Sequence, residues 1–565
     1  MDFHDFHSLF EQFLRGDVAS QASTCRSLML FLPELILSGS IVLLLLSRLT
    51  SVDKLVPTHW IALLGGMTAF IVVLLQFYAI NLPRLGHQLP DTGPVLSLMN
   101  TLSSPFMGGP TELFTGLAVH DMFSIFLRGF LLFFLVFVIA LTVLSGIPDQ
   151  EDAPDFYTLL SGAVVGMMLM SSANHLLMLF LGIEMASVPS YAMTGFLKGR
   201  RQSSEAALKF VVYGAGAAGV MLFGISLLAG LTGTAEFSEL GNRLHAIFKT
   251  GFGAGYPEGR VVLLALLMIV VGFAFKLSLV PFHFWCPDAF QGASAEVAGF
   301  LSIGSKAAAF ALLVRFSMAV TAGAAGVLHE LSLVFGLGLG VLAVVTATFG
   351  NLAAYSQTNA KRMLAYSTIA HAGYMLMAVS ALLVLRSASS GISFEQSERA
   401  IEGLLYYLAV YLFMNLGAFA IVALIRNQLF SEEIDDYKGL AYQSPLLAVC
   451  MGVCLFSLIG LPPLGGFYGK FFIFAAVFDA TQVHWFMWVV LAAGGLNTVL
   501  SLFYYINVLK VMCMKERPTE ARPVSLTSQS SAGLYVMLVS GMVLLLGIVV
   551  EPLSVVAHRA AAALF

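Results

Sequence analysis

The sequence predicts an all-α protein that crosses a membrane about fourteen times, and three observations lead to this fold class. Hydrophobic residues make up 58% of the 565 residues and charged residues only 11%, whereas soluble domains carry about 25% charged residues. Apolar runs of about 20 residues, the length of a membrane-spanning helix, recur along the chain. The connections between these runs are mostly short, so no large water-soluble domain is expected.

Each expected span is an apolar run bounded by charged residues or by glycine and proline. In chain order, the expected spans cover residues 27–48, 59–81, 117–144, 157–175, 177–197, 204–230, 261–285, 296–319, 329–351, 361–384, 402–425, 445–474, 485–512 and 532–556. Three connections are longer than the others, at residues 82–116, 231–260 and 426–444. No P-loop is present, and no GxGxxG motif lies between a strand and a helix. The sequence therefore gives no sign of a nucleotide-binding domain.

Basic residues gather on one side of this topology. With fourteen spans both chain ends lie on the same side, and the clusters at residues 198–201, 361–362 and 510–522 lie on the other. Because cytoplasmic loops carry an excess of Lys and Arg, we expect the clusters to be cytoplasmic and both termini to be outside. Residues 1–26 are acidic and amphipathic and lack the basic start of a signal peptide, so they are expected to form an N-terminal extension.

Two expected spans, the seventh and the twelfth, contain a helix-breaking signal. The seventh includes KLSLVPFHF with Pro281, and the twelfth includes LIGLPPLGGFYGKF with Pro462 and Pro463. Proline removes a helical hydrogen bond, and in a membrane the freed backbone is tolerated only against protein or a water-filled cavity. In transporters a matching pair of interrupted spans marks the ion path.

The five-span separation between the two breaks predicts two five-helix repeats. An odd number of spans in each repeat makes the second repeat inverted relative to the first. We therefore divide the chain into an extension, three N-terminal helices, a first repeat, a second repeat and a C-terminal helix, at residues 1–26, 27–145, 157–319, 329–512 and 532–565.

Ionisable residues inside the expected spans are the candidate functional residues. A charged side chain at the bilayer centre costs about 2.5–3.5 kcal/mol on insertion scales, so such groups persist where they are paired, hydrated or used. The candidates are Glu184, Lys209, Lys276, Lys306, His371 and Lys470. As a set they suit proton transfer, although each of them also has a structural interpretation.

Lys276, five residues before Pro281, is the central candidate. Burial lowers the pKa of a lysine and a nearby carboxylate raises it again, so a lysine between these states can exchange a proton near neutral pH. Arginine cannot do this. Glu184 has no basic residue within one turn of its own helix and is the expected partner of Lys276. The alternative is that Glu184 only pins two helices together.

Lys306 and His371 extend this set. Lys306 has the small neighbours Gly304, Ser305 and Ala307, which leave room for water, although a lysine whose ammonium reaches the membrane surface is the alternative. His371 has a reference pKa of about 6.5 and suits proton exchange. A single histidine on an apolar face is more often a core residue.

Lys470 and Lys209 complete the candidates. Lys470 follows the glycine-rich break of the twelfth span and is the expected outer lysine. Lys209 lies one helical turn after Glu205, and this order of Glu and Lys is favourable, so an ordinary ion pair within one helix is the alternative. We interpret two further charged residues of the spans, Glu34 and Arg128, as structural.

The composition also limits the cofactors and the cargo. The five cysteines are scattered and cannot hold an iron–sulfur cluster, and no histidine pair has the spacing of a haem or zinc site. The formal net charge of −4 suggests no nucleic-acid partner. The expected cargo is small, a proton or Na⁺.

Five stretches resemble one known family, and they occur in its order. They are LGIEMASVPSYAM, SSEAALKFVVYGA, FKLSLVPFHFWCPDAFQGASAEVAGFLSIGSKAAAF, NAKRMLAYSTIAHAGYML and GLPPLGGFYGKFFIF. Together they resemble the subunit N family of bacterial respiratory complex I, an NADH:quinone oxidoreductase. The resemblance implies an antiporter-like fold with two inverted repeats and one proton channel, driven by quinone reduction elsewhere in the complex.

The resemblance implies a role for each candidate residue. Glu184 and Lys276 form a coupled pair, Lys306 and His371 continue the central row, Lys470 is the outer lysine and Lys209 is an auxiliary basic group. No cofactor binds this chain, so NADH, FMN, iron–sulfur clusters and quinone belong to partner subunits. The implied partners are the other membrane-arm subunits and lipid, with no nucleic acid, and the implied location is the bacterial inner membrane.

Two other functions stay open. An Mrp-type cation/proton antiporter subunit shares the fold and works from ion gradients alone, and a membrane scaffold would use the charges only to lock helices. The resemblance favours subunit N, because subunit M of complex I typically has glutamate where Lys470 stands. The other relatives also lack the wording SIGSKAAAF around Lys306.

Overall fold

The computed structural model describes residues 26–54, 56–81, 110–248, 257–322, 327–388, 394–518, 522–524, 527 and 529–565. The extension expected at residues 1–26 therefore lies outside the described residues, apart from Arg26.

Thirteen helices in the described part of the chain are long and apolar enough to cross a membrane. They are α3 (Leu32–Leu49), α4 (His59–Asn81), α6 (Met122–Ser145), α7 (Ala153–Ser172), α8 (Leu176–Thr194), α9 (Arg201–Thr232), α11 (Pro257–Leu277), α13 (Ala295–Val320), α14 (Val327–Ala354), α15 (Ala360–Arg386), α16 (Phe394–Leu429), α20 (Phe486–Met514) and α21 (Ser531–Ile548). Two shorter helices, α18 (Pro445–Ile459) and α19 (Gly465–Ala480), follow one another at the expected twelfth span. The prediction of an all-α membrane protein with about fourteen spans is thus confirmed.

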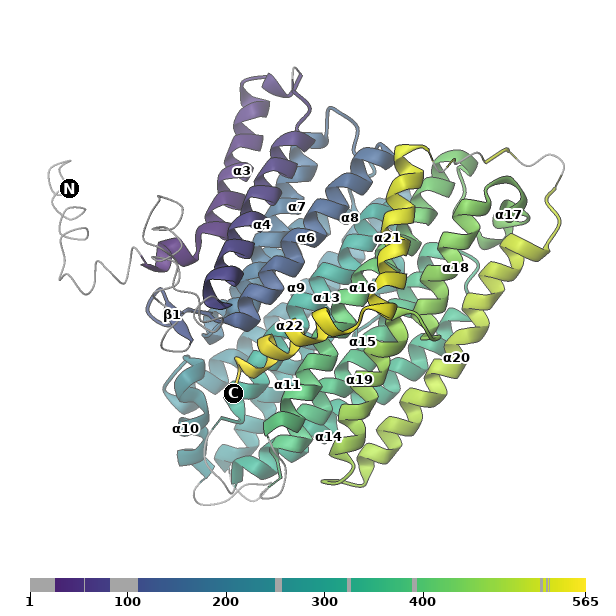
Figure 1. The fold of residues 1–565 in the computed structure, drawn as a ribbon. Coiled ribbons are helices and arrows are strands. Elements are labelled where there is room, and N and C mark those ends of the chain that lie inside the picture. Colours follow the sequence, from purple (N-terminus) through teal and green to yellow (C-terminus); the bar gives the residue numbers. More distant parts are fainter. Residues whose placement is uncertain are drawn as a thin grey trace, which may run out of the picture.

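Two expected spans end earlier than the sequence suggested. The seventh, expected to reach residue 285, ends at Leu277, because Ser278 adopts a left-handed conformation with φ of 60°; a separate short helix, α12 (Trp285–Gly292), follows. The fourteenth ends at Ile548, and a new helix, α22 (Glu551–Ala562), begins with a proline in its first turn, a position that suits proline. Figure 1 shows α22 lying across the bundle, where it packs on α16 and α6.

All three long connections contain secondary structure that the sequence did not predict, and the one at residues 426–444 includes a 3₁₀ turn at Ile434–Tyr437 and the short helix α17 (Leu440–Gln443). An amphipathic helix, α10 (Phe237–Phe248), lies within the connection 231–260 and packs on α13. The strands β1 (Thr111–Leu113) and β2 (Ala118–His120) form an antiparallel pair, so the third span begins later than residue 117. It begins after Asp121, whose carboxylate accepts a hydrogen bond from the Ser124 backbone nitrogen at 2.7 Å, a typical N-terminal cap.

The loops meet in two groups at the two ends of the bundle. At one end, Lys198 forms an ion pair with Asp152 at 2.6 Å and Lys515 pairs with Asp435 at 3.6 Å. We call this end the basic face; it carries the loops at residues 146–152, 195–200, 355–359, 430–439 and 515–518. At the opposite face, the backbone nitrogen of Leu176 donates to the carbonyl of Ala235 at 2.8 Å.

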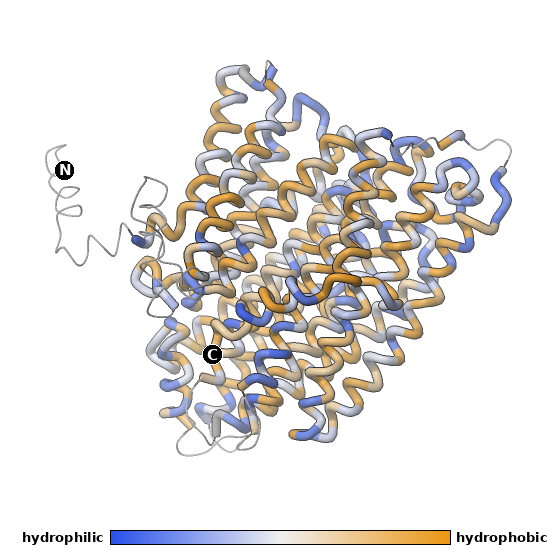
Figure 2. Tube along the Cα trace, viewed as in Figure 1, coloured by the Kyte–Doolittle hydropathy of each residue, from blue (hydrophilic) through white to orange (hydrophobic). Residues whose placement is uncertain are grey.

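Three helices, α13, α15 and α16, lie at the centre, and their most apolar 18-residue windows are completely buried. The corresponding windows of α4 and α20, at the periphery, are only 28% buried. Figure 2 shows apolar residues along the helices, with hydrophilic residues mainly at the loops. A helix surrounded by protein does not meet lipid, so the central helices can keep polar side chains within the membrane.

Candidate functional site

The broken seventh span opens the backbone next to Lys276. After Leu277 the chain leaves the helix, and two carbonyl groups at the end of α11 accept hydrogen bonds from elsewhere: Phe275 from the Trp285 indole nitrogen at 2.9 Å and Leu277 from the Lys306 ammonium at 3.1 Å. The C-terminal end of a helix carries a partial negative charge. This end therefore stabilises a cation without a carboxylate.

Lys276 itself is buried and contacts α8. Its ammonium donates a hydrogen bond to the Ser187 hydroxyl at 2.8 Å. Glu184 lies one turn earlier on the same helix and is within electrostatic range of Lys276. Both residues are among those described, and no ion pair within 4.0 Å joins them. Ser187 is thus the direct partner of the lysine, and Glu184 acts on it over a longer distance.

Lys306 links the broken helix to α15. In addition to the Leu277 carbonyl, its ammonium donates to the Thr368 carbonyl at 3.1 Å. Both partners are neutral backbone oxygens, and the side chain is 2% exposed. A lysine in this position cannot reach the membrane surface, which removes the alternative that its ammonium lies there.

His371 lies in a cluster of tyrosines. Its Nδ1 and Nε2 are 2.5 Å and 3.2 Å from the hydroxyls of Tyr407 and Tyr505, on α16 and α20. The Tyr505 hydroxyl also contacts that of Ser367. A hydroxyl both donates and accepts a hydrogen bond, so these groups can serve the imidazole in either protonation state.

Lys470 repeats the chemistry of Lys306 at the second break. Its ammonium donates to the carbonyls of Leu458 and Ile459 at 3.0 Å and 2.9 Å, at the end of α18. It also lies 4.4 Å from the centre of the Tyr374 ring, a distance at which a cation is attracted to the face of a ring.

Helix α15 joins these groups into one row. Thr368, His371 and Tyr374 follow each other at three-residue spacing, so they lie along one side of the helix. Thr368 contacts Lys306 and Tyr374 contacts Lys470, with His371 between them on the helix. We call Lys276, Lys306, His371 and Lys470 the central row; none of the four is more than 3% exposed. Every member can bind and release a proton, and none is an arginine.

Lys209 lies apart from the central row. It is 41% exposed and pairs with Glu205 at 2.8 Å and Asp288 at 2.9 Å. Asp288 also accepts from Arg362 at 2.6 Å. These groups border a polar pocket of about 180 Å³ between α9 and α12, near the basic face. The intrahelical pair anticipated for Lys209 is present, within a wider cluster of charges.

Several groups around the central row escaped sequence analysis. Ser187 binds Lys276 through its hydroxyl, and Thr368 binds Lys306 through its backbone carbonyl. The chain contains many serine hydroxyls and many carbonyls, and nothing in the sequence marks these two as lysine partners. Tyr407 and Tyr411 did offer a signal, because hydroxyls four residues apart lie on one face of a helix. Both are completely buried against His371.

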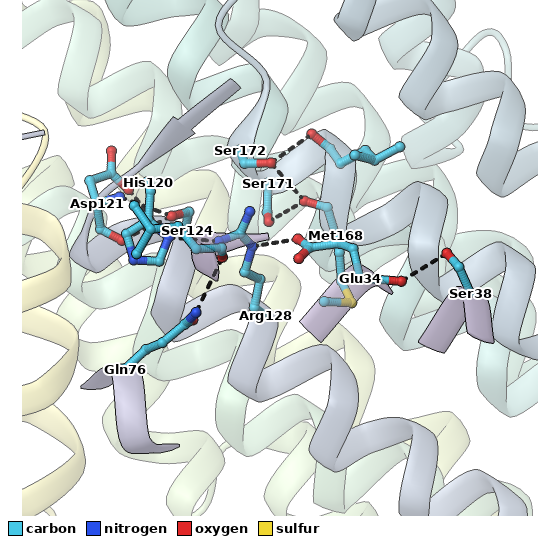
Figure 3. Close-up of polar contacts among 12 residues, drawn as sticks. Glu34, Ser38, Gln76, His120, Asp121, Ser124, Arg128, Met168, Ser171 and Ser172 are labelled. Carbon is cyan, nitrogen blue, oxygen red and sulfur yellow. Dashed lines mark hydrogen bonds and ion pairs between the residues drawn. The ribbon is translucent and has the colours of Figure 1, made fainter. Parts of the chain in front are cut away.

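Glu34 and Arg128 belong to a second buried cluster of polar residues (Figure 3). The Arg128 Nε is 2.7 Å from the Glu34 carboxylate, and its Nη1 is 2.9 Å from Nδ1 of His120. A guanidinium only donates hydrogen bonds, so the histidine accepts at Nδ1. Burial, with the neighbouring Arg128 charge, lowers the pKa of His120 well below its ordinary value. This neutral histidine and the ion pair connect α3, β2 and α6, in agreement with the structural interpretation.

The glycines after the second break allow its two halves to pack closely, and this leads to a prediction. A Cβ at Gly466 would collide with the backbone carbonyl of Ser457, which cannot move without separating α18 from α19. We expect Gly466→Ala to lower the amount of assembled protein in the membrane severely. Gly495→Ala is the control, because a Cβ there has no atom within 4 Å. Equal amounts of the two variants, measured by immunoblot, would contradict the prediction.

The chain is similar to known proteins over most of its length. Residues 173–501 match the family described as NADH:quinone oxidoreductase/Mrp antiporter, TM. The subunit N of NADH-quinone oxidoreductase from Anaeromyxobacter sp. is 42% identical over 73% of this chain and 79% of its own length. The subunit N 2 from Chloroherpeton thalassium is 34% identical over 94% of this chain and 93% of its own length.

Solved structures agree with these relatives. A chain of respiratory complex I from Thermus thermophilus with bound aureothin is 28% identical, with a TM-score of 0.66, and the match covers 92% of this chain and 97% of that one. A chain of the Mrp complex from Dietzia sp. is 18% identical with a TM-score of 0.71, covering 96% and 98%, and shows the shared fold alone. The chain belongs to the antiporter-like family of NADH:quinone oxidoreductase membrane subunits, in the branch formed by subunit N.

Proposed function

We propose that this chain carries protons across the membrane as subunit N of an NADH:quinone oxidoreductase, through the central row. The single observation that supports this most is the row itself. Four buried ionisable groups follow one another from one broken helix to the other, with backbone carbonyls, hydroxyls and an aromatic ring as their partners. A scaffold that only locks helices needs no such succession.

In this proposal each residue has one role. Lys276 exchanges a proton with Lys306, and Glu184 supports the charged form of Lys276 from a distance. Lys306 and His371 pass the proton on, and Lys470 delivers it at the far end. Lys209 acts from outside the row, as an auxiliary group. Backbone carbonyls at the helix breaks stabilise the ammonium groups of Lys306 and Lys470 while these hold the proton, and the Ser187 hydroxyl does so for Lys276.

The remaining parts of the reaction belong to partners. Quinone reduction elsewhere in the complex supplies the free energy, and NADH, FMN, iron–sulfur clusters and quinone bind to other subunits. The partners of this chain are the other membrane-arm subunits and lipid. We place the chain in the bacterial inner membrane with the basic face toward the cytoplasm and both termini outside.

A second function, cation/proton exchange as in Mrp-type antiporters, is favoured by the shared family description. The two functions differ in what drives transport. A subunit of an NADH:quinone oxidoreductase moves protons on addition of NADH and quinone in Na⁺-free medium, whereas an antiporter needs a cation gradient.

The test uses the complete complex, purified in mild detergent and reconstituted into liposomes that contain a pH-sensitive dye. We expect Lys276→Ala to lower the number of protons moved per NADH oxidised several-fold, with the complex fully assembled. Lys198→Ala is the matched control, since that lysine is 74% exposed at the basic face. Normal pumping by an assembled Lys276→Ala complex would rule out the proposed relay, and pumping that requires a Na⁺ gradient would favour the antiporter.

A further inference from the structure

A second group of buried charges lies at the basic-face end of the three central helices and takes no part in the central row. Lys361, in the first turn of α15, forms an ion pair with Glu432 at 2.9 Å and donates to the Ala293 carbonyl at 2.6 Å. Beside it, Arg426 of α16 pairs with Glu296 of α13 at 3.2 Å. The sequence predicts Lys361 as part of a basic cluster in a surface loop, but this residue is 1% exposed.

The pair formed by Lys361 and Glu432 connects the protein interior with the surface. The glutamate side chain is 13% exposed and belongs to the loop that follows α16. The lysine beside it is almost completely enclosed. Water at the basic face can therefore meet part of the Glu432 side chain, whereas its Oε1, which faces Lys361, and the ammonium are enclosed by protein.

Lys361 also stands in line with the central row. It precedes Thr368 by seven residues on α15, which places both on the same side of the helix, and Thr368 holds Lys306 by its carbonyl. The rise of an α-helix makes this separation about 10 Å, the length of a chain of about three water molecules. His371 follows three residues later.

We infer that Lys361 and Glu432 are the proton-loading pair of this subunit, through which protons pass from water at the basic face to Lys306. This inference rests on the proposed function of the central row and adds its entrance. Lys361 gives a proton inward and becomes a neutral amine. Glu432, protonated by a hydronium ion that is left as water, transfers that proton to the amine and becomes a carboxylate again. Charge and protons are balanced, and Arg426 and Glu296 stay paired beside them throughout.

A purely structural ion pair makes a different prediction. If Lys361 only fastens the loop after α16 to α15, then any cation that reaches Glu432 and Ala293 serves equally well. Arginine keeps the charge and its hydrogen bonds but does not release its proton in proteins. Likewise, glutamine at position 432 keeps a hydrogen-bond acceptor for the ammonium but cannot carry a proton. The two hypotheses therefore separate on conservative substitutions.

The experiment compares Lys361→Arg and Glu432→Gln with wild type in the reconstituted complex, as protons moved per NADH oxidised. We expect each variant to assemble and to lower this ratio several-fold, as Lys276→Ala does. Arg362→Lys and Glu433→Gln are the matched controls. Arg362 contacts Asp288 and Gln291, and Glu433 accepts from Asn359 at 3.3 Å, so neither control residue touches the loading pair.

The outcomes separate this inference from the proposed function. Normal pumping by Glu432→Gln, or by an assembled Lys361→Arg complex, overturns the inference. Because Glu432 lies in a surface loop, its variant decides the question even if Lys361→Arg prevents assembly. Lys276→Ala is measured in the same preparation. Lost pumping in that variant beside normal pumping in Glu432→Gln removes only the entrance, whereas normal pumping by Lys276→Ala removes the central row as well.

Discussion

Replacement of Lys306 by methionine is expected to abolish proton translocation in a complex that still assembles. Lys306 connects the broken helix α11 to α15 through the carbonyls of Leu277 and Thr368, and no other residue of the central row contacts both helices. A proton-transfer group typically contributes about 100-fold or more to rate, so the protons moved per NADH oxidised should fall to background. Methionine has a similar length and fills the same space without a charge.

Two further measurements make this prediction specific. The rate of NADH oxidation by the same liposomes is recorded with and without an uncoupler. The ratio of the two rates differs between a complex whose proton channel is blocked and one in which oxidation is uncoupled from pumping. Lys306→Arg keeps a cation beside the two carbonyls but does not release a proton, and it should fail in the same way. Recovery of pumping with arginine would mean that Lys306 only holds the helices together.

Arg128→Met is expected to have the largest effect on stability. It leaves the Glu34 carboxylate buried without its cation, and breaking a buried pair on one side costs about 3–5 kcal/mol. The N-terminal helices α3 and α6 should then separate, which lowers the thermal stability of the subunit and its amount in the membrane. The measurement is the temperature at which the complex loses its subunits in mild detergent.

The double variant Glu34→Gln/Arg128→Met provides the internal check. It removes both charges, so most of the lost stability should return. Arg48→Met is the external control, because Arg48 pairs with Asp155 at the surface, where ion pairs contribute little. If the double variant is no more stable than Arg128→Met, the ion pair is not what holds these helices.

The sequence was sufficient to predict where the membrane spans lie along the chain, but not which residues of different spans contact each other. Prolines at residues 281, 462 and 463 identified both breaks, because a proline acts on its own helix. The partners of the ionisable residues come from distant parts of the chain. Ser187 lies 89 residues from Lys276, and no periodicity of either helix specifies that they meet.

Lys361 shows the same limit in its clearest form. A lysine followed by an arginine at the start of a helix is typical of a loop at the membrane surface. It is buried only because the loop after α16 folds over it and supplies Glu432, 71 residues further along the chain. Local sequence predicts where a charged residue enters the membrane, while its burial depends on which loop covers it.

The backbone partners of Lys306 and Lys470 have an electrical consequence. Neutral carbonyls bind both ammonium groups, so no unpaired anion is left behind when either lysine loses its proton. Each site therefore alternates between a charge of +1 and no charge. His371 lies within electrostatic range of both. A positive charge at one of these residues therefore repels a second proton in this poorly screened interior. Protons should consequently pass along the central row one at a time.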